Sequence, residues 1–160
     1  MYDKRLGLPK NDAETVKWWG KAADQGNARA QLDLGFMYTE GQGVPKSDAE
    51  GLKWYQKATD QGNARAQSNL GLMYAQGRGA HQNYVHAHMW FNLAAMQGNQ
   101  DAIKNQNIAV QRMTPAQIAE AQKLAREWRP IGRDGKSPNG ARDRVSIHFW
   151  AASPKKSRFY

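Results

Sequence analysis

The sequence predicts an all-α protein, a solenoid of antiparallel helix pairs with a 36-residue repeat. The main observation is self-similarity. The segment KAADQGNARAQLDLGFMY (21–38) returns as KATDQGNARAQSNLGLMY (57–74) and, with more changes, as LAAMQGNQDAIKNQNIAV (93–110). A period of 20 to 50 residues is typical of solenoids, in which each unit buries its apolar face against its neighbours. Apolar residues inside each unit recur at three- and four-residue steps, which indicates helices.

The first predicted helix covers about residues 12–25, with Val16, Trp19 and Ala23 on one apolar stripe. Met1 and Tyr2 align with the last turn of the later repeating helices, so we expect them to end a helix whose body is missing from this chain. An apolar patch would then be left at this end of the solenoid. We expect it either to mediate self-association or to be covered by the chain's own C-terminal residues Ile147, Phe149 and Trp150.

The next two helices form the best-preserved unit. Asn27 is the expected N-cap of a helix that ends near Glu40, and Gly26 suits the left-handed turn before it. A loop containing Gly41, Gly43 and Pro45 cannot continue that helix. Ser47 or Asp48 then starts a second helix that runs to about Gln61. Its expected apolar positions are Leu52, Trp54 or Tyr55, and Ala58.

Two glycines occupy the same register inside the first helix of successive units. Gly35 and Gly71 lie mid-helix, where glycine costs roughly 1 kcal/mol relative to alanine. Their repetition indicates that the partner helix packs too closely for a side chain. We also expect Trp54 and Trp90, which share a register with Trp18, to be core residues between helices.

A capping helix is predicted over about residues 115–128. Thr114, Pro115 and Gln117 form a capping box with proline at the first helical position. The apolar stripe that follows consists of Ile118, Ala121, Leu124, Ala125 and Trp128. We therefore assign residues 1–128 to the solenoid, with a truncated first unit, two fuller units and this cap. Residues 129–160 form a basic tail that contains Gly and Pro.

These features resemble the Sel1-like repeat, a relative of the tetratricopeptide repeat. The matching residues of one continuous unit are Ala28, Ala30, Gln31, Leu34, Gly35, Tyr38, Gly41, Gly43, Val44, Asp48, Trp54, Lys57, Ala58, Gln61 and Gly62. The resemblance covers about residues 1–113 and weakens over 80–88. It implies a right-handed α/α superhelix that serves as a scaffold or adaptor for other proteins, often in bacteria.

Charge supports a second interpretation. The formal net charge is +9, and residues 129–160 hold eight Lys and Arg against two Asp. The alternative function is therefore binding of nucleic acid or another acidic surface through the tail, which would weaken steeply with salt. The tail also contains an alternating segment, 144–150, that is typical of a short strand. Because the chain has no cysteine and no recognisable leader, the sequence does not decide between periplasm and cytoplasm.

The sequence predicts no enzyme, no cofactor and no metal site. Ser153 and Lys156 have the spacing of a penicillin-recognising serine site, but the Ser-Asp-Asn and Lys-Thr-Gly partners of that chemistry are missing. His86 and His88 are two residues apart and would point away from each other on a helix. By register we expect His88 to be a core residue and His86 to be solvated.

The candidate binding surface is a stripe on the first helix of each unit. Each row ends in an apolar residue, namely Phe36, Leu72 or Ile108. The flanking polar residues are Arg29, Asp33, Arg65, Asn69, Asp101 and Asn105. One interpretation is that the apolar residues pack between adjacent helices. The other is that they form a row of anchors on the concave face that binds a peptide or a helix of another protein.

Overall fold

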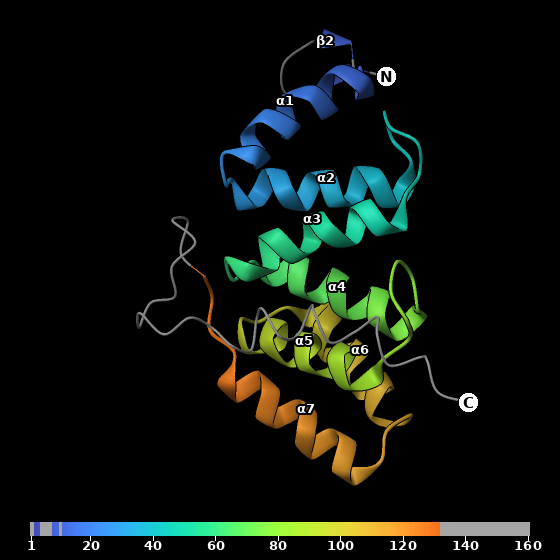
Figure 1. The fold of residues 1–160 in the computed structure, drawn as a ribbon, viewed down its shortest axis with the longest axis vertical. Coiled ribbons are helices and arrows are strands. Elements are labelled where there is room, and N and C mark those ends of the chain that lie inside the picture. The colour runs from blue at the N-terminus through green and yellow to red at the C-terminus, as the bar shows by residue number, and fades with distance from the viewer. Residues whose placement is uncertain (1, 4–7, 10, 132–160) are drawn as a thin grey trace, which may run out of the picture.

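The computed structural model describes residues 2–3, 8–9 and 11–131, and over these residues it is a stack of seven α-helices (Figure 1). The helices are α1 (Asp12–Asp24), α2 (Ala28–Glu40), α3 (Asp48–Asp60), α4 (Ala64–Gln76), α5 (Tyr84–Met96), α6 (Gln100–Val110) and α7 (Pro115–Glu127). From α1 to α6 each helix packs against the next, and α7 packs against α5. The predicted all-α solenoid is therefore confirmed.

The N-terminal residues differ from the prediction. Strands β1 (Tyr2–Asp3) and β2 (Leu8–Pro9) pair antiparallel, with Tyr2 opposite Pro9 and Asp3 opposite Leu8. The expectation that Tyr2 ends a helix is wrong. A last turn without its preceding residues lacks the carbonyl partners of a helix, and helix nucleation is costly, so a paired extended backbone is the better solution. Figure 1 shows β2 beside α1 at one end of the stack.

Helix starts fall where the polar caps predict them. Asn27, Asn63 and Asn99 each accept a hydrogen bond from the backbone N–H three residues later, at 3.0, 2.9 and 2.8 Å. Of the two candidates before α3, Ser47 is the N-cap, and its Oγ accepts from the Glu50 N–H at 3.2 Å. These caps satisfy backbone donors that a helix start leaves without a partner.

Glycines make the connections between helices compact. Gly26, Gly62 and Gly98 have φ of 85° to 87° at the tight turns after α1, α3 and α5. Gly79, in the longer loop after α4, has φ of 70°. A Cβ there would lie 2.6 Å from the backbone oxygen of Asp48. The loop of one unit therefore rests on the start of α3 in the unit before it.

The predicted close approach at the mid-helix glycines is confirmed. A Cβ on Gly35 would overlap the ring of Tyr55, with Cε1 at 2.5 Å. A Cβ on Gly71 would lie 2.7 Å from Cε1 of Phe91. Each glycine thus admits an aromatic ring from the paired helix, and that packing compensates for the poor helix propensity of glycine.

Helices α3 and α5 each carry two adjacent aromatic residues, and the second of the two lies in the core. Tyr55 is 3% exposed, and Phe91 is 1% exposed at the same register. Trp90 is 2% exposed, as predicted, but Trp54 is only partly buried at the edge of a smaller cluster formed by α1 and α2. The prediction of a core Trp54 is therefore too strong, because among the described residues no helix covers its outer side as α7 covers Trp90.

Glutamine side chains link the start of α2 to the ends of α1 and α3, and the start of α4 to the end of α5. Gln31 is 4% exposed, and its Nε2 donates to the Ala23 carbonyl at 3.0 Å, while its Oε1 accepts from Gln61 Nε2 at 2.9 Å. One repeat later, Gln97 Nε2 donates to Gln67 Oε1, also at 2.9 Å. These part-buried hydrogen bonds explain why glutamine recurs at both positions.

The capping helix α7 begins as predicted. The Thr114 Oγ1 accepts from the Gln117 N–H, and the Gln117 side chain accepts from the Thr114 N–H. At its other end, Trp128 packs edge-on against Trp90, with ring centroids 5.9 Å apart. The contact with α5 closes the larger core cluster at this end.

Helix α6 shows how the regular pairing stops. Lys104 and Asn107 on α6, and Gln111 at its C-cap, are exposed at the positions that Leu32, Gly35 and Thr39 occupy on α2. Those positions receive the paired helix in the earlier unit, and polar side chains there cannot do so favourably. The next helix, α7, accordingly docks on α5. After α7, the Ile131 N–H donates to the carbonyl of Asp60.

Among the described residues, no helix is both long enough and apolar enough to cross a bilayer.

Candidate protein-interaction face

The predicted anchors lie at equivalent positions of α2, α4 and α6. Phe36 is 47% exposed, Leu72 is 37% exposed and Ile108 is 60% exposed. Leu34 and Leu70, on the buried side of the same helices, are 1% and 0% exposed. The three anchors therefore do not fill the space between helices. We refer to Phe36, Leu72 and Ile108 as the apolar ladder.

The polar flank of the ladder is organised differently in each row. On α2, Arg29 Nε donates to both carboxylate oxygens of Asp33, at 3.0 and 3.2 Å. This exposed pair contributes little to stability but holds both side chains beside Phe36. On α4, Arg65 is exposed and Asn69 is half-buried. The Asn69 side chain acts to lower the pKa of the Tyr55 hydroxyl on α3, against the larger effect of burial.

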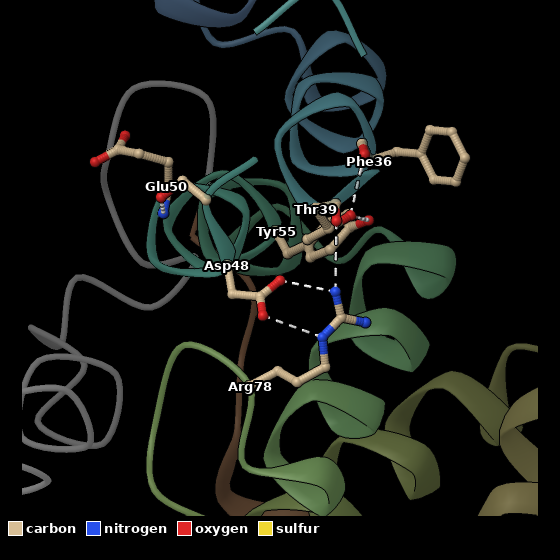
Figure 2. A network of polar contacts seen from close by, with 7 residues as sticks. Phe36, Thr39, Asp48, Glu50, Tyr55 and Arg78 are labelled. Carbon is tan, nitrogen blue, oxygen red and sulfur yellow. Dashed lines mark hydrogen bonds and ion pairs between the residues drawn. The ribbon is translucent and has the colours of Figure 1, made fainter. Parts of the chain in front are cut away.

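A polar network behind the ladder fixes the end of α2 (Figure 2). The Thr39 hydroxyl donates to the Phe36 carbonyl at 3.0 Å and lies 3.4 Å from the Tyr55 hydroxyl. Burial raises the pKa of Tyr55 above its usual range, so this phenol is neutral at physiological pH. Phe36 itself points away from the network in Figure 2. Its backbone is thus held rigidly while its ring stays accessible.

An ion pair connects this network to the next loop. Arg78 donates to Asp48 through two nitrogens, with Nη2 to Oδ1 at 2.7 Å and Nε to Oδ2 at 3.2 Å. Its Nη2 also lies 3.5 Å from the Thr39 carbonyl (Figure 2). Because Arg78 follows α4 while Asp48 starts α3, the bidentate pair fixes the contact between successive units.

We expect this ion pair to add acid sensitivity to the fold. Hydrogen bonds from Arg78 hold the pKa of Asp48 below its usual value, against an opposing effect of burial. A lowered folded-state pKa stabilises the protein above the unfolded pKa, and the contribution is lost as pH falls below about 4. Arg78→Gln, which copies Gln42 of the preceding unit, should lose at most about 1 kcal/mol at neutral pH.

Urea unfolding of both proteins at a series of pH values tests this prediction. The difference in free energy of unfolding between wild type and Arg78→Gln should be constant near neutral pH. It should shrink toward zero in acid. A gap that does not depend on pH would contradict the role assigned to the ion pair.

Sequence reasoning identified the ladder but missed the network behind it. Arg78 occupies the register of Gln42, so no repetition marks it. The glutamine pairs were a detectable signal, since Gln31 and Gln61 recur at 67 and 97. Asp101 and Asn105 lie on α6, exposed and half-buried respectively, and complete the third row.

Comparison with known families identifies the repeat. The sequence pattern of the Sel1 repeat matches residues 1–27, 28–63 and 64–99. The chain belongs to the Sel1 repeat family. The matched repeats end at residue 99, so α6 and α7 follow them, although the resemblance in the sequence was expected to reach about residue 113. Sel1 repeat proteins generally act as protein–protein interaction scaffolds.

Two solved bacterial structures are similar to this Sel1 chain. A protective antigen of uropathogenic Escherichia coli with an SLR fold superposes with a TM-score of 0.74 and 28% identity, over 98% of this chain and 32% of the antigen. A Sel1 repeat protein from Oxalobacter formigenes gives a TM-score of 0.63 and 39% identity, over 67% of this chain and 44% of that one. The chain therefore spans less than half the length of either relative. No curated protein matches the sequence.

His86 and His88, in the third Sel1 unit, are packing residues. His88 is 1% exposed, as predicted, and its Nε2 lies 3.4 Å from Gln106 Nε2. His86 is half-buried, which corrects the expectation of a solvated residue, because Tyr74 packs edge-on against it at 5.3 Å. Burial lowers the pKa of His86 to about 4, so it is neutral at physiological pH. Over the described residues, no group of three potential ligands could hold a metal ion.

Several predictions concern residues that the structure does not describe. Ser153 and Lys156, the alternating segment 144–150 and the residues Ile147, Phe149 and Trp150 all lie outside the described part. The same holds for the basic tail beyond Ile131, on which the alternative function depends.

Proposed function

We propose that this Sel1 domain is a scaffold that binds an amphipathic peptide or helix of another protein along the apolar ladder, on the concave face that the resemblance implies. The observation that carries the proposal is the exposure of Phe36, Leu72 and Ile108, between 37% and 60%, at one register of successive units. Apolar groups left in water at equivalent positions are a favourable binding surface, because a partner that covers them removes apolar area from water.

Rigidity and polarity of the same face support the proposal. The Phe36 carbonyl accepts from the Thr39 hydroxyl, which also lies 3.4 Å from the Tyr55 hydroxyl, so the Phe36 end of the ladder is held in place before binding. A preorganised surface loses less conformational freedom when a partner binds. The Arg29–Asp33 pair beside Phe36 offers both signs of charge at the rim. A helix with apolar residues on one stripe and polar residues beside it matches this arrangement.

We expect the double variant Phe36→Ala/Leu72→Ala to lose partner binding while keeping its fold. Anchors of this type often account for 2 kcal/mol or more, which corresponds to a roughly 30-fold loss of affinity. Proteins captured on the immobilised full chain from a lysate of the source organism would be quantified by mass spectrometry. The captured segment would then be synthesised and titrated against wild type and variant.

The matched control is Met96→Ala/Ile103→Ala. Met96 and Ile103 are also exposed, at 76% and 37%, but they lie off the ladder. A partner lost with the ladder variant and kept by the control supports the proposal. Equal retention by both variants would contradict it. A partner that dissociates steeply with salt, yet ignores the ladder substitutions, would instead favour the basic tail.

A further inference from the structure

The outer face of α1 carries an exposed tryptophan at a position that is covered elsewhere in the chain. Trp18, Trp54 and Trp90 share one register. Trp90 is 2% exposed, and Trp54 is partly buried among residues of α1 and α2, but Trp18 is 66% exposed. Lys21 lies over the Trp18 ring as Lys57 lies over that of Trp54, with the Nζ 5.0 and 4.2 Å from the ring centroids. The contact between lysine and tryptophan is therefore repeated. Among the described residues, Trp18 lacks the neighbours that cover Trp54 and Trp90.

Charged residues surround Trp18 on this face. Together they line one shallow hollow, formed by Asn11, Ala13, Glu14, Lys17, Trp18, Gly20, Lys21 and Asp24. None of the charged groups of this face has an ion-pair partner among the described residues. The side of α1 with Val16 and Trp19 packs into the fold instead. Strand β2 lies at the same end of the stack (Figure 1). Trp18 is exposed although this strand is nearby.

The order of the charges matches a second copy of the same helix. Consider an antiparallel, two-fold contact centred between Lys17 and Trp18. Each residue of one copy then faces the residue of the other copy that lies equally far from the centre on its opposite side. Glu14 then lies opposite Lys21 of the other copy, and Lys17 opposite its Trp18 ring. Each contact occurs twice, because a two-fold interface uses the same patch on both molecules. A contact centred on Trp19 would instead place Lys17 opposite Lys21 and Glu14 opposite Asp24, so the charges favour the centre between Lys17 and Trp18 over that alignment.

We infer that the chain self-associates through α1 as an antiparallel, two-fold pair, with Trp18 at its centre and Glu14 and Lys21 as reciprocal ion-pair partners. A single helix of 13 residues is about 20 Å long, so the contact is smaller than a standard interface. Binding is accordingly weak, with a dissociation constant above the low micromolar range. This surface is separate from the apolar ladder on α2, α4 and α6.

Charge reversal tests the alignment. Sedimentation of the full chain in low salt, from low micromolar to millimolar concentration, should show a rising average mass for the wild type. Glu14→Lys or Lys21→Glu alone should each raise the dissociation constant about tenfold, since two attractive pairs become two repulsive ones. The double variant Glu14→Lys/Lys21→Glu should return close to the wild-type constant, and Trp18→Ser should abolish dimers.

Thermal melts separate this effect from simple damage to α1. The double variant puts Lys in the first turn and Glu in the last turn, which opposes the helix dipole at both ends. A merely structural effect would therefore make the double variant the weakest of the set. Restored association by the double variant supports the inference. A wild type that stays monomeric at all concentrations, or a double variant that associates less than either single one, would overturn it.

Discussion

Replacing Trp90 by alanine is expected to lower the free energy of unfolding by about 3 to 5 kcal/mol, the usual cost of emptying a large buried aromatic site. Trp90 is 2% exposed and packs edge-on against Trp128, so its removal opens a cavity between α5 and α7. Tyr74 and Phe91 are buried members of the same core cluster, so the cavity would lie inside a closely packed core. A loss of this size is a large fraction of the stability of an ordinary domain.

The repeat itself supplies graded controls for this prediction. Trp54→Ala should cost about 1 to 2 kcal/mol, because the ring is only partly buried. Trp18→Ala should change stability by less than about 0.5 kcal/mol in dilute solution, because its ring is 66% exposed. Chemical denaturation of all three variants would measure the series. Equal losses at Trp18 and Trp90 would show that burial does not govern the energetics at this register.

The sequence was sufficient for the local structure of each unit. Periodicity, the polar caps and the paired glycines depend on neighbours close in the chain, and they predicted where α2 and α3 begin and how Gly35 packs. Burial was harder to predict, because it depends on what lies on the other side of a helix. Trp54 and Trp90 have the same register, yet only Trp90 meets α7. His86 was misassigned for a related reason, since its cover comes from Tyr74 on another helix.

The candidate face illustrates the same division. The stripe of Phe36, Leu72 and Ile108 could be located from the repeat, but its exposure depends on how the helices stack. The network that holds it could not be located, because Arg78 occurs once and pairs with Asp48 thirty residues away. Repetition predicts what all units share. It does not predict interactions that a single unit has acquired.

The second large effect concerns the closest helix contact. Gly35→Ala is expected to destabilise the fold by about 2 kcal/mol, although alanine is the better helix former by about 1 kcal/mol. The added methyl group would overlap the Tyr55 ring, with Cε1 at 2.5 Å. Tyr55 cannot move aside freely, because it is 3% exposed and its hydroxyl lies 3.4 Å from the Thr39 hydroxyl. Overpacking of this kind costs about 1 to 3 kcal/mol and outweighs the gain in propensity.

Gly20→Ala is the matched control for this prediction. Gly20 is also inside a helix, α1, but a Cβ there would meet nothing within 4 Å. Alanine should therefore contribute its propensity alone and stabilise the protein by about 0.5 to 1 kcal/mol. The two identical substitutions should shift the midpoint of urea unfolding in opposite directions, measured in dilute solution. If both variants were more stable than the wild type, the approach of α3 to α2 would be looser than the structure shows, and glycine at position 35 would have no packing role.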